Sequence, residues 1–331
     1  MRANYSDEQL RLAARLYYVD GLGQTEVAKF AKVSQAKVSR MLALARQRGI
    51  VRISVAEYEP RDSSLEQRLC ERFQLGAAAV IKTVARSTPE EARRAVGHFG
   101  APFVAALVPR GSVVAIAGGR TIQELVQALP EDKERRLTVV QAMGSIDYTV
   151  GPVDALELGR TLARRSGGFF LTLNTPAFVP DKRTRDAFLA HEQIRGLWQR
   201  LRQAEVALVG IGSLDNSAFV ERGVLSATDL QDLKQRGAVG EICGRFFDAA
   251  GRECDSPWRD RVLSIDLERV RRIPQVIGVV AGADRAAALT AAMRGGLIKS
   301  LVLDVAGAQA LLQDDPPLPT TGFKAKQVSN R

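Results

Sequence analysis

The sequence predicts an α/β protein with a small N-terminal helix-turn-helix domain and a larger Rossmann-like domain. The 331 residues exceed what one compact core usually holds, so two domains are expected. Apolar residues recur at helical spacing in the first fifty residues, whereas short runs of Val, Ile and Leu alternate with helical stretches further on. Such alternation is typical of a mostly parallel sheet covered by helices on both faces.

Changes in composition along the chain divide it into four segments. We expect a helix-turn-helix domain, a linker helix, a larger α/β domain and a disordered tail, over residues 1–56, 57–75, 76–315 and 316–331. The linker helix is short and amphipathic, so it packs on the large domain or helps to pair subunits. The tail is polar and carries three basic residues and no acid, namely Lys324, Lys326 and Arg331.

The composition also excludes several classes of protein. No run of eighteen apolar residues is present, and the polar N-terminus lacks a signal-peptide core, so no membrane span or export is expected. Three cysteines without a CxxC pair fit the reducing cytoplasm. With only His98 and His191, a His-rich metal site is not expected, and no cofactor is indicated.

Positive charge is concentrated at the N-terminus. The chain has a net charge of +10, and residues 1–55 hold ten basic against four acidic residues, a net of +6. A basic module of this kind suggests a polyanionic partner. A solvated basic surface would give the same count, so the charge alone does not show that this module binds a polyanion.

The first sixty residues predict three helices followed by a strand. The helices begin near Ser6, Gln24 and Ser34, and the second and third span about 24–31 and 35–48. Gly49 ends the third helix, and residues 50–55 alternate apolar and polar like a strand. Two short helices joined by a three- or four-residue turn have helix-turn-helix geometry.

The third helix carries the candidate base-reading residues. Such a helix presents its N-terminal outer face to the major groove, where Gln pairs with adenine, Arg with guanine, and Ala contacts the thymine methyl. Basic residues such as Lys37, Arg46 and Arg48 could instead contact phosphates. The alternative is a three-helix module that docks on protein. The candidate DNA-contacting residues are Gln24, Thr25, Ser34, Gln35, Ala36, Lys37, Ser39, Arg40 and Arg46.

From Gly76 onward the chain alternates strands and helices. The expected strands are 76–81, 113–117, 137–143, 169–173, 206–211, 262–265, 276–280 and 301–304. The expected helices are 89–107, 122–129, 155–166, 183–190, 193–202, 228–236, 267–270 and 286–295. In parallel sheets, ligands bind beyond the carboxyl ends of the strands, so the turns that follow the strands are the candidate site.

Glycine-rich turns follow several of these strands. Gly118–Thr121 precedes a helix, so its backbone could cradle a phosphate, although a plain tight turn would look the same. The turn matches neither a Walker motif nor GxGxxG. Glu241 could accept hydrogen bonds from sugar hydroxyls, and Arg285 could pair with a phosphate. The candidate effector-binding residues are Gly118, Gly119, Arg120, Thr121, Met143, Gly144, Gly210, Gly212, Glu241 and Arg285.

These segments together resemble the SorC/DeoR-type family of bacterial transcriptional regulators, from about Leu10 to Leu312. The matching segments are Leu12–Tyr18, Gly21–Ala31, VSRMLALARQRGIVRISV at 38–55, GGRT at 118–121, GIG at 210–212, GAVGEICGRFFDAAG at 237–251, and 273–296. The resemblance implies that the helix-turn-helix domain is winged and that residues 76–315 form a sugar-binding effector domain resembling phosphosugar isomerases in fold. It also implies a phosphorylated sugar or related effector, operator DNA as partner, and a homotetramer built as a dimer of dimers. It further implies that Gly118–Thr121 bind phosphate and that Glu241 and Arg285 contact the effector.

Two positions depart from that family's pattern. The family usually has Asp where this chain has Glu241, and Lys where it has Arg285. Both replacements keep the charge of the side chain but change its length or shape, and so the distance at which it can contact a ligand. In addition, Arg cannot form a Schiff base as Lys can. The sugar bound therefore cannot be named from the resemblance.

The leading hypothesis is a regulator of double-stranded operator DNA controlled by a sugar or sugar phosphate, and not an enzyme. One alternative is a sugar-phosphate isomerase or deaminase with a DNA-binding appendage. That chemistry needs a general base, for which only Glu241, Asp147 and Asp215 are candidates, without an evident acid partner. The other alternative, an architectural DNA binder, does not explain a large crevice-bearing domain.

Overall fold

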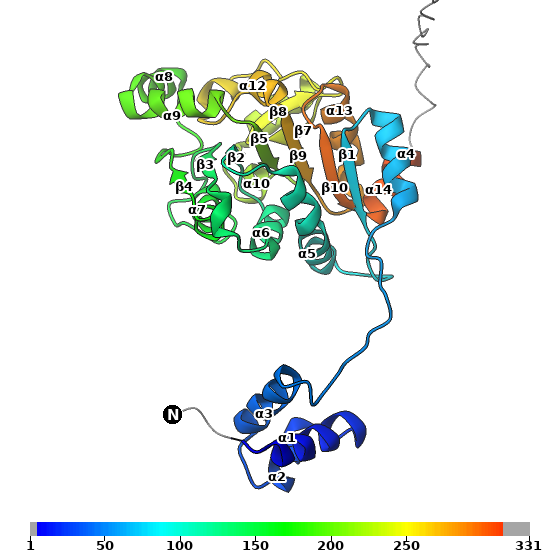
Figure 1. Ribbon diagram of the computed structural model, residues 1–331. Coiled ribbons are helices and arrows are strands. Elements are labelled where there is room, and N and C mark those ends of the chain that lie inside the picture. Colours follow the sequence, from blue (N-terminus) through cyan, green and yellow to red (C-terminus); the bar gives the residue numbers. More distant parts are fainter. Residues whose placement is uncertain (1–4, 314–331) are drawn as a thin grey trace, which may run out of the picture. The chain divides into compact units, whose positions relative to one another are not determined.

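The chain forms two compact units, Met1–Tyr58 and Glu59–Arg331, which are considered separately below. The computed structural model describes residues 5–313 (Figure 1), so the predicted disordered tail lies outside the described residues. Within the described part of the chain, no helix is long and apolar enough to cross a membrane.

From residue 5 onward, the N-terminal unit contains three α-helices and a π-helical turn. These are α1 Asp7–Ala14, η1 Arg15–Val19, α2 Gln24–Phe30 and α3 Gln35–Gln47. Ser6 and Gln9 form a reciprocal capping box that starts α1. Leu10, Val27 and Val38, one from each α-helix, are fully buried against one another in the small core. The predicted helices are therefore formed, and the turn between α2 and α3 is four residues long.

The strand predicted over residues 50–55 is wrong. Residues 52–60 have no regular secondary structure, and the side chains of Ile53 and Val55 are 57% and 81% exposed. A strand forms only where another backbone segment completes its hydrogen bonds, and no described strand lies within this unit. The unit is a helix-turn-helix without a wing strand in its described residues.

The larger unit is built on a seven-stranded parallel sheet. In chain order the strands are β1 Ala77–Ile81, β2 Val113–Ile116, β3 Thr138–Gln141, β4 Phe169–Leu171, β5 Val206–Val209, β9 Gln275–Val279 and β10 Ser300–Asp304. Their spatial order is β1-β10-β9-β5-β2-β3-β4, and every pairing is parallel. The parallel α/β architecture predicted from the sequence is confirmed.

Alternate residues of the strands enter two separate cores, one on each face of the sheet. One face is covered by α5 Pro89–Leu107, α6 Arg120–Ala128 and α7 Ala155–Ser166. The other face packs on α4 Ser63–Phe73, α9 Glu192–Arg202, α12 Leu267–Arg272, α13 Ala286–Arg294 and α14 Val305–Gln313 (Figure 1). The remaining α-helices are α8 Lys182–Ala190, α10 Ala218–Glu221 and α11 Ala227–Gln235. Strand residues such as Ala79 and Val80 therefore contribute to opposite cores, as expected for a sheet buried on both sides.

The strand predicted at 262–265 is also wrong. This segment joins no sheet and forms only isolated antiparallel bridges, Met143 with Ser264 and Phe178 with Val262. Its backbone bonds go to loops that follow β3 and β4: the Leu263 N–H donates to the Ala177 carbonyl and the Ile265 N–H to that of Ala142. The segment crosses strand ends and does not lie beside a strand.

A second, three-stranded antiparallel sheet was not predicted. Its strands are β6 Gly212–Ser213, β7 Ala238–Ile242 and β8 Arg245–Asp248, in the order β6-β7-β8. Cys243 and Gly244 form the two-residue turn between β7 and β8, and both have positive φ, +54° and +73°. Such a turn matches the twist of a hairpin. The hairpin places Glu241 beside Gly212.

The strand order creates a crevice between β2 and β5. From β2 the chain proceeds outward through β3 to β4, and then returns to the other side of β2 to form β5. The loops after β2 and β5 consequently leave the sheet in different directions. At this kind of switch point, open α/β sheets bind ligands.

Candidate effector pocket and DNA-contacting face

The candidate DNA-contacting residues gather at the start of α2 and along α3. Ser34 caps α3, since its hydroxyl accepts a hydrogen bond from the Lys37 N–H at 3.3 Å. Val38 is fully buried, so the opposite side of the helix faces solvent. Gln24 is half-buried, and the other candidates are exposed: Thr25, Ser34, Gln35, Ala36, Lys37, Ser39, Arg40 and Arg46. This face is free of the unit's own core.

Arg40 in α3 and Arg48, which directly follows α3, differ in what they contact. The Arg40 Nε donates to the Ala36 carbonyl of its own helix at 3.2 Å, which leaves its guanidinium at the surface. Arg48, considered above as a phosphate contact, instead donates to the Asp7 carboxylate at 2.7 Å and to the Tyr5 carbonyl at 3.3 Å. Arg48 thus ties the end of α3 to the start of α1.

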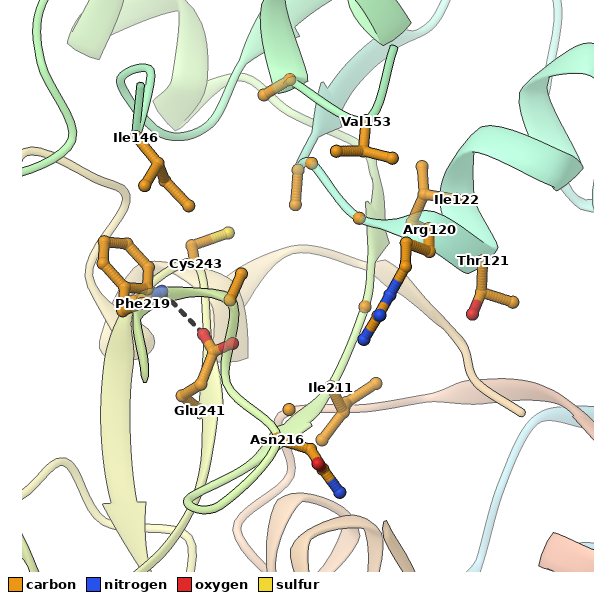
Figure 2. A pocket seen from close by; sticks show the side chains of 18 of the residues that line it. Arg120, Thr121, Ile122, Ile146, Val153, Ile211, Asn216, Phe219, Glu241 and Cys243 are labelled. Carbon is orange, nitrogen blue, oxygen red and sulfur yellow. Dashed lines mark hydrogen bonds between the residues drawn. The ribbon is translucent and has the colours of Figure 1, made fainter. Parts of the chain in front are cut away.

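A cavity of about 250 Å³ opens at the carboxyl ends of the parallel strands (Figure 2). The loops after β2, β3, β5 and β9 line it, together with β7 and α10. Nine of the ten candidate effector residues line this pocket: Gly118, Gly119, Arg120, Thr121, Met143, Gly210, Gly212, Glu241 and Arg285. The topology thereby brings together residues separated by more than 160 positions in the chain.

Gly144 is the candidate that does not line the pocket. Its N–H donates to the Leu263 carbonyl at 3.0 Å, and a Cβ at this position would lie 2.3 Å from the Pro176 carbonyl oxygen. Gly144 therefore permits close packing between loops beneath the pocket. The lack of a side chain at this position makes room for the neighbouring backbone and does not shape the pocket.

Gly118 and Gly119 shape the turn at the start of α6. Gly119 has φ of +138°, which strains any other residue, and it caps α6 without a side-chain hydrogen bond. A Cβ on Gly118 would lie 2.8 Å from the Val153 carbonyl oxygen. The amino end of α6, with its partial positive charge, therefore borders the pocket and suits an anion.

Replacing Gly118 by alanine is expected to open this turn and to weaken binding of an anionic ligand at least several-fold. The added methyl must displace backbone atoms of the 153–155 segment, and overpacking of this kind costs about 1–3 kcal/mol. Gly151→Ala is the matched control, because a Cβ there meets nothing within 4 Å. Thermal shift with phosphate measures both variants, and equal shifts for both would contradict a role for the turn.

Three arginines converge on one side of the pocket: Arg93 from α5, Arg120 and Arg285. Arg285 donates to its neighbour Asp284 at 2.9 Å and to the Ala281 carbonyl at 3.1 Å. Among residues 5–313, Arg93 has no ion pair or side-chain hydrogen bond. Burial, followed by the positive charges of Arg120 and Arg285, lowers the pKa of Arg93. Sequence reasoning missed Arg93 because it lies within a helix and follows no strand.

Glu241 enters the pocket from β7, where its carboxylate accepts the Gly244 N–H at 2.8 Å (Figure 2). Gly212 makes room for it, since a Cβ there would lie 2.6 Å from Glu241 Oε1. Burial raises the pKa of Glu241 to about 7, against the smaller lowering by the Gly244 hydrogen bond. Near neutral pH the carboxyl can therefore donate or accept a hydrogen bond.

The other candidate bases for isomerase chemistry are engaged elsewhere. Asp147 accepts a hydrogen bond from Arg222 at 2.6 Å, and Asp215 is 83% exposed. Burial raises the pKa of the neighbouring Cys243 thiol well above its usual range, which disfavours a nucleophilic thiolate. Within residues 5–313, no group of three or more potential ligands is placed to hold a metal ion. The pocket is equipped to bind a polar ligand by charge and hydrogen bonds.

Comparison with known proteins gives consistent matches over nearly the whole chain. Residues 60–313 match the family model described as "Putative sugar-binding domain". The chain is 28% identical over 324 residues to an uncharacterized transcriptional regulator, YjhU, of Escherichia coli K12, covering 95% of this chain and 97% of that protein. It is 27% identical to the sorbitol operon regulator of Klebsiella pneumoniae over 311 residues, covering 91% and 96%.

Solved structures agree with these relatives. The full-length sorbitol operon regulator SorC from Klebsiella pneumoniae superposes with a TM-score of 0.75 at 27% identity, covering 94% of this chain and 100% of that chain. A structure described as "Putative Sugar-Binding Domain of Transcriptional Repressor from Vibrio fischeri" gives a TM-score of 0.68 at 30% identity, covering 76% of this chain and 98% of that one.

A helix-turn-helix unit joined to a parallel-sheet domain with a ligand pocket defines an effector-controlled transcriptional regulator. The chain belongs to the sugar-binding-domain family and is a SorC-type, sugar-responsive transcriptional regulator. The similar proteins cited above are named as regulators and not as enzymes.

Proposed function

We propose that α3 binds operator DNA and that a phosphorylated sugar or related phosphorylated metabolite, held in the pocket, controls this binding. The observation that carries the proposal is the cluster of Arg93, Arg120 and Arg285 beside the glycine turn at the start of α6. A phosphate group is the common metabolite group that satisfies several guanidinium groups and a helix amino end at once. Glu241, across the pocket, would hydrogen-bond the sugar hydroxyls.

Binding of the effector would be non-covalent. Arg285 departs from the lysine expected from the family resemblance, and a guanidinium cannot form a Schiff base with a sugar carbonyl. The effector would thus act by binding the DNA-competent and DNA-incompetent states with different affinities, with a coupling no larger than that difference. Operator DNA and phosphorylated metabolites meet in the cytoplasm, where we place the protein as a homotetramer that reads paired half-sites.

Titration of sugar phosphates into a complex of the protein with DNA from upstream of its own gene tests this function. We expect one phosphorylated sugar to change DNA affinity by about 5- to 150-fold, the range of typical allosteric coupling. Arg120→Ala should remove the response while DNA affinity without effector stays unchanged, because Arg120 belongs to the larger unit. If no sugar or sugar phosphate alters DNA binding, the proposed switch is wrong.

A further inference from the structure

A segment after β6 lines the pocket and forms polar contacts with three other segments of the larger unit. This strap, residues 214–225, contains α10. Its Asn216 amide donates to the Asp284 carboxylate at 2.8 Å, its Glu221 accepts from Arg120 at 2.8 Å, and its Arg222 donates to Asp147 at 2.6 Å. The strap therefore bonds to the loops that follow β9, β2 and β3.

The middle of the strap is held by packing. Phe219 is 1% exposed, and its ring lies edge-on to that of Trp258, with centroids 5.3 Å apart. A Cβ on Gly244 would lie 2.6 Å from the same ring. Because Phe219 fixes the strap in the core, the three polar contacts decide how its exposed side chains lie over the pocket.

Glu221 is the acid that pairs with Arg120, one of the three arginines of the cluster. Its carboxylate pairs with Arg120 Nη2, and both side chains line the pocket. The two side chains are 41% and 46% exposed, and ion pairs this exposed are only weakly stabilising. Arg245 and Glu253 differ, since their side chains are 9% and 14% exposed. The Arg120–Glu221 pair is therefore weak enough to exchange for a better anion.

Arg93 is the arginine of the cluster that no carboxylate pairs with among the described residues. Glu221 bonds to Arg120 and Asp284 bonds to Arg285, whereas the positive charges of Arg120 and Arg285 still bear on Arg93. A phosphate carries up to two negative charges and three acceptor oxygens, and can therefore serve more than one guanidinium. Replacing Glu221 by such a ligand relieves repulsion that Glu221 leaves in place.

We propose that Glu221 is a built-in competitor of the effector, which a phosphate group must displace from Arg120 when it binds. This inference rests on the proposed function of the pocket as a phosphate-binding site. The competitor lowers the affinity of the pocket for weakly charged anions and favours dianionic ligands. Displacement also releases one of the three polar contacts that hold the strap, so occupancy of the pocket is coupled to the conformation of residues 214–225.

Isothermal titration of the full-length protein with inorganic phosphate, at constant ionic strength, tests the competition. Glu221→Gln should bind phosphate about 1.5- to 5-fold more tightly than the wild type, which is the affinity equivalent of the weak pair. Glu134→Gln is the matched control: it removes one negative charge from an exposed pair with Arg136, near the amino end of β3 and away from the pocket. Its phosphate affinity should equal that of the wild type.

The outcomes separate this inference from the proposed function. If the wild type binds phosphate and Glu221→Gln binds it no more tightly, Glu221 does not compete, while the phosphate site itself remains supported. If the wild type binds no phosphate, the proposed phosphate site fails, and the competition fails with it. A phosphate-bound structure in which the Glu221 carboxylate stays within about 4 Å of the Arg120 guanidinium would likewise overturn displacement.

Discussion

Replacing Arg40 by alanine is expected to weaken operator binding about 5- to 150-fold, equivalent to about 1–3 kcal/mol. Arg40 lies on the exposed face of α3, and its side chain donates a hydrogen bond to the Ala36 carbonyl of the same helix. The fold therefore should not depend on this side chain, and alanine favours the helix. Fluorescence anisotropy with operator DNA and with unrelated DNA, at fixed salt, measures the loss.

Two further variants separate base reading from phosphate contact. Lys37→Ala should weaken binding to all DNA sequences similarly and reduce the slope of log affinity against log salt by about one. Arg11→Ala removes an exposed cation from α1 and should leave operator preference unchanged. If Arg40→Ala loses as much affinity for unrelated DNA as for the operator, Arg40 contacts phosphates and does not read a base.

Replacing Glu241 by glutamine is expected to stabilise the protein at pH 8 by up to about 3 kcal/mol, and to change little at pH 4.5. Burial raises the pKa of Glu241 from 4.5 to about 7, so between these pH values the folded state binds a proton that the unfolded state has released. The free energy of unfolding therefore falls as pH rises through this window. Glutamine carries no charge and keeps an oxygen to accept the Gly244 N–H.

Urea unfolding of both proteins at intervals between pH 4.5 and pH 8 measures this difference. The wild type should lose stability relative to Glu241→Gln progressively, and most of the difference should be present at pH 7.5. Profiles that remain parallel over the whole range would show that the carboxyl stays ionised in the folded protein. Such a result would contradict the view that burial dominates its environment.

Local signals account for much of the fold. The predicted helix 89–107 matches α5 because Thr88 and Glu91 form a capping box and Pro89 occupies the first turn. Likewise, α7 begins after the Asp154 cap and ends at Gly167, whose φ is +63°. The strands at 50–55 and 262–265 failed because alternation does not reveal whether a partner strand exists. The hairpin around Cys243 was missed because its turn lacks the usual Asn-Gly or Asp-Gly pair.

The pocket was predictable to the extent that topology alone determines it. Residues directly after buried parallel strands, such as Gly118 and Gly210, must meet at one edge of the sheet. Arg93 and Glu221 reach the same place from helices, and Glu221 pairs with an arginine 101 positions earlier in the chain. No local sequence pattern predicts that these two side chains reach the pocket. Gly144 illustrates the converse, since a glycine after a strand also serves close backbone packing.

The pairing of β1 with β10 has a consequence for biosynthesis. Ala77 lies opposite Ser300, so the first strand of the sheet has its neighbour only after more than two hundred further residues have been made. At about 5–20 residues per second, a ribosome needs roughly 10–50 s to pass from the end of the helical unit to β10. During that interval the helical unit, whose contacts are local, can fold, while β1 remains an unpaired edge. Each nascent chain can thus complete the unit that we propose to read DNA before it completes the pocket that we propose to sense a metabolite.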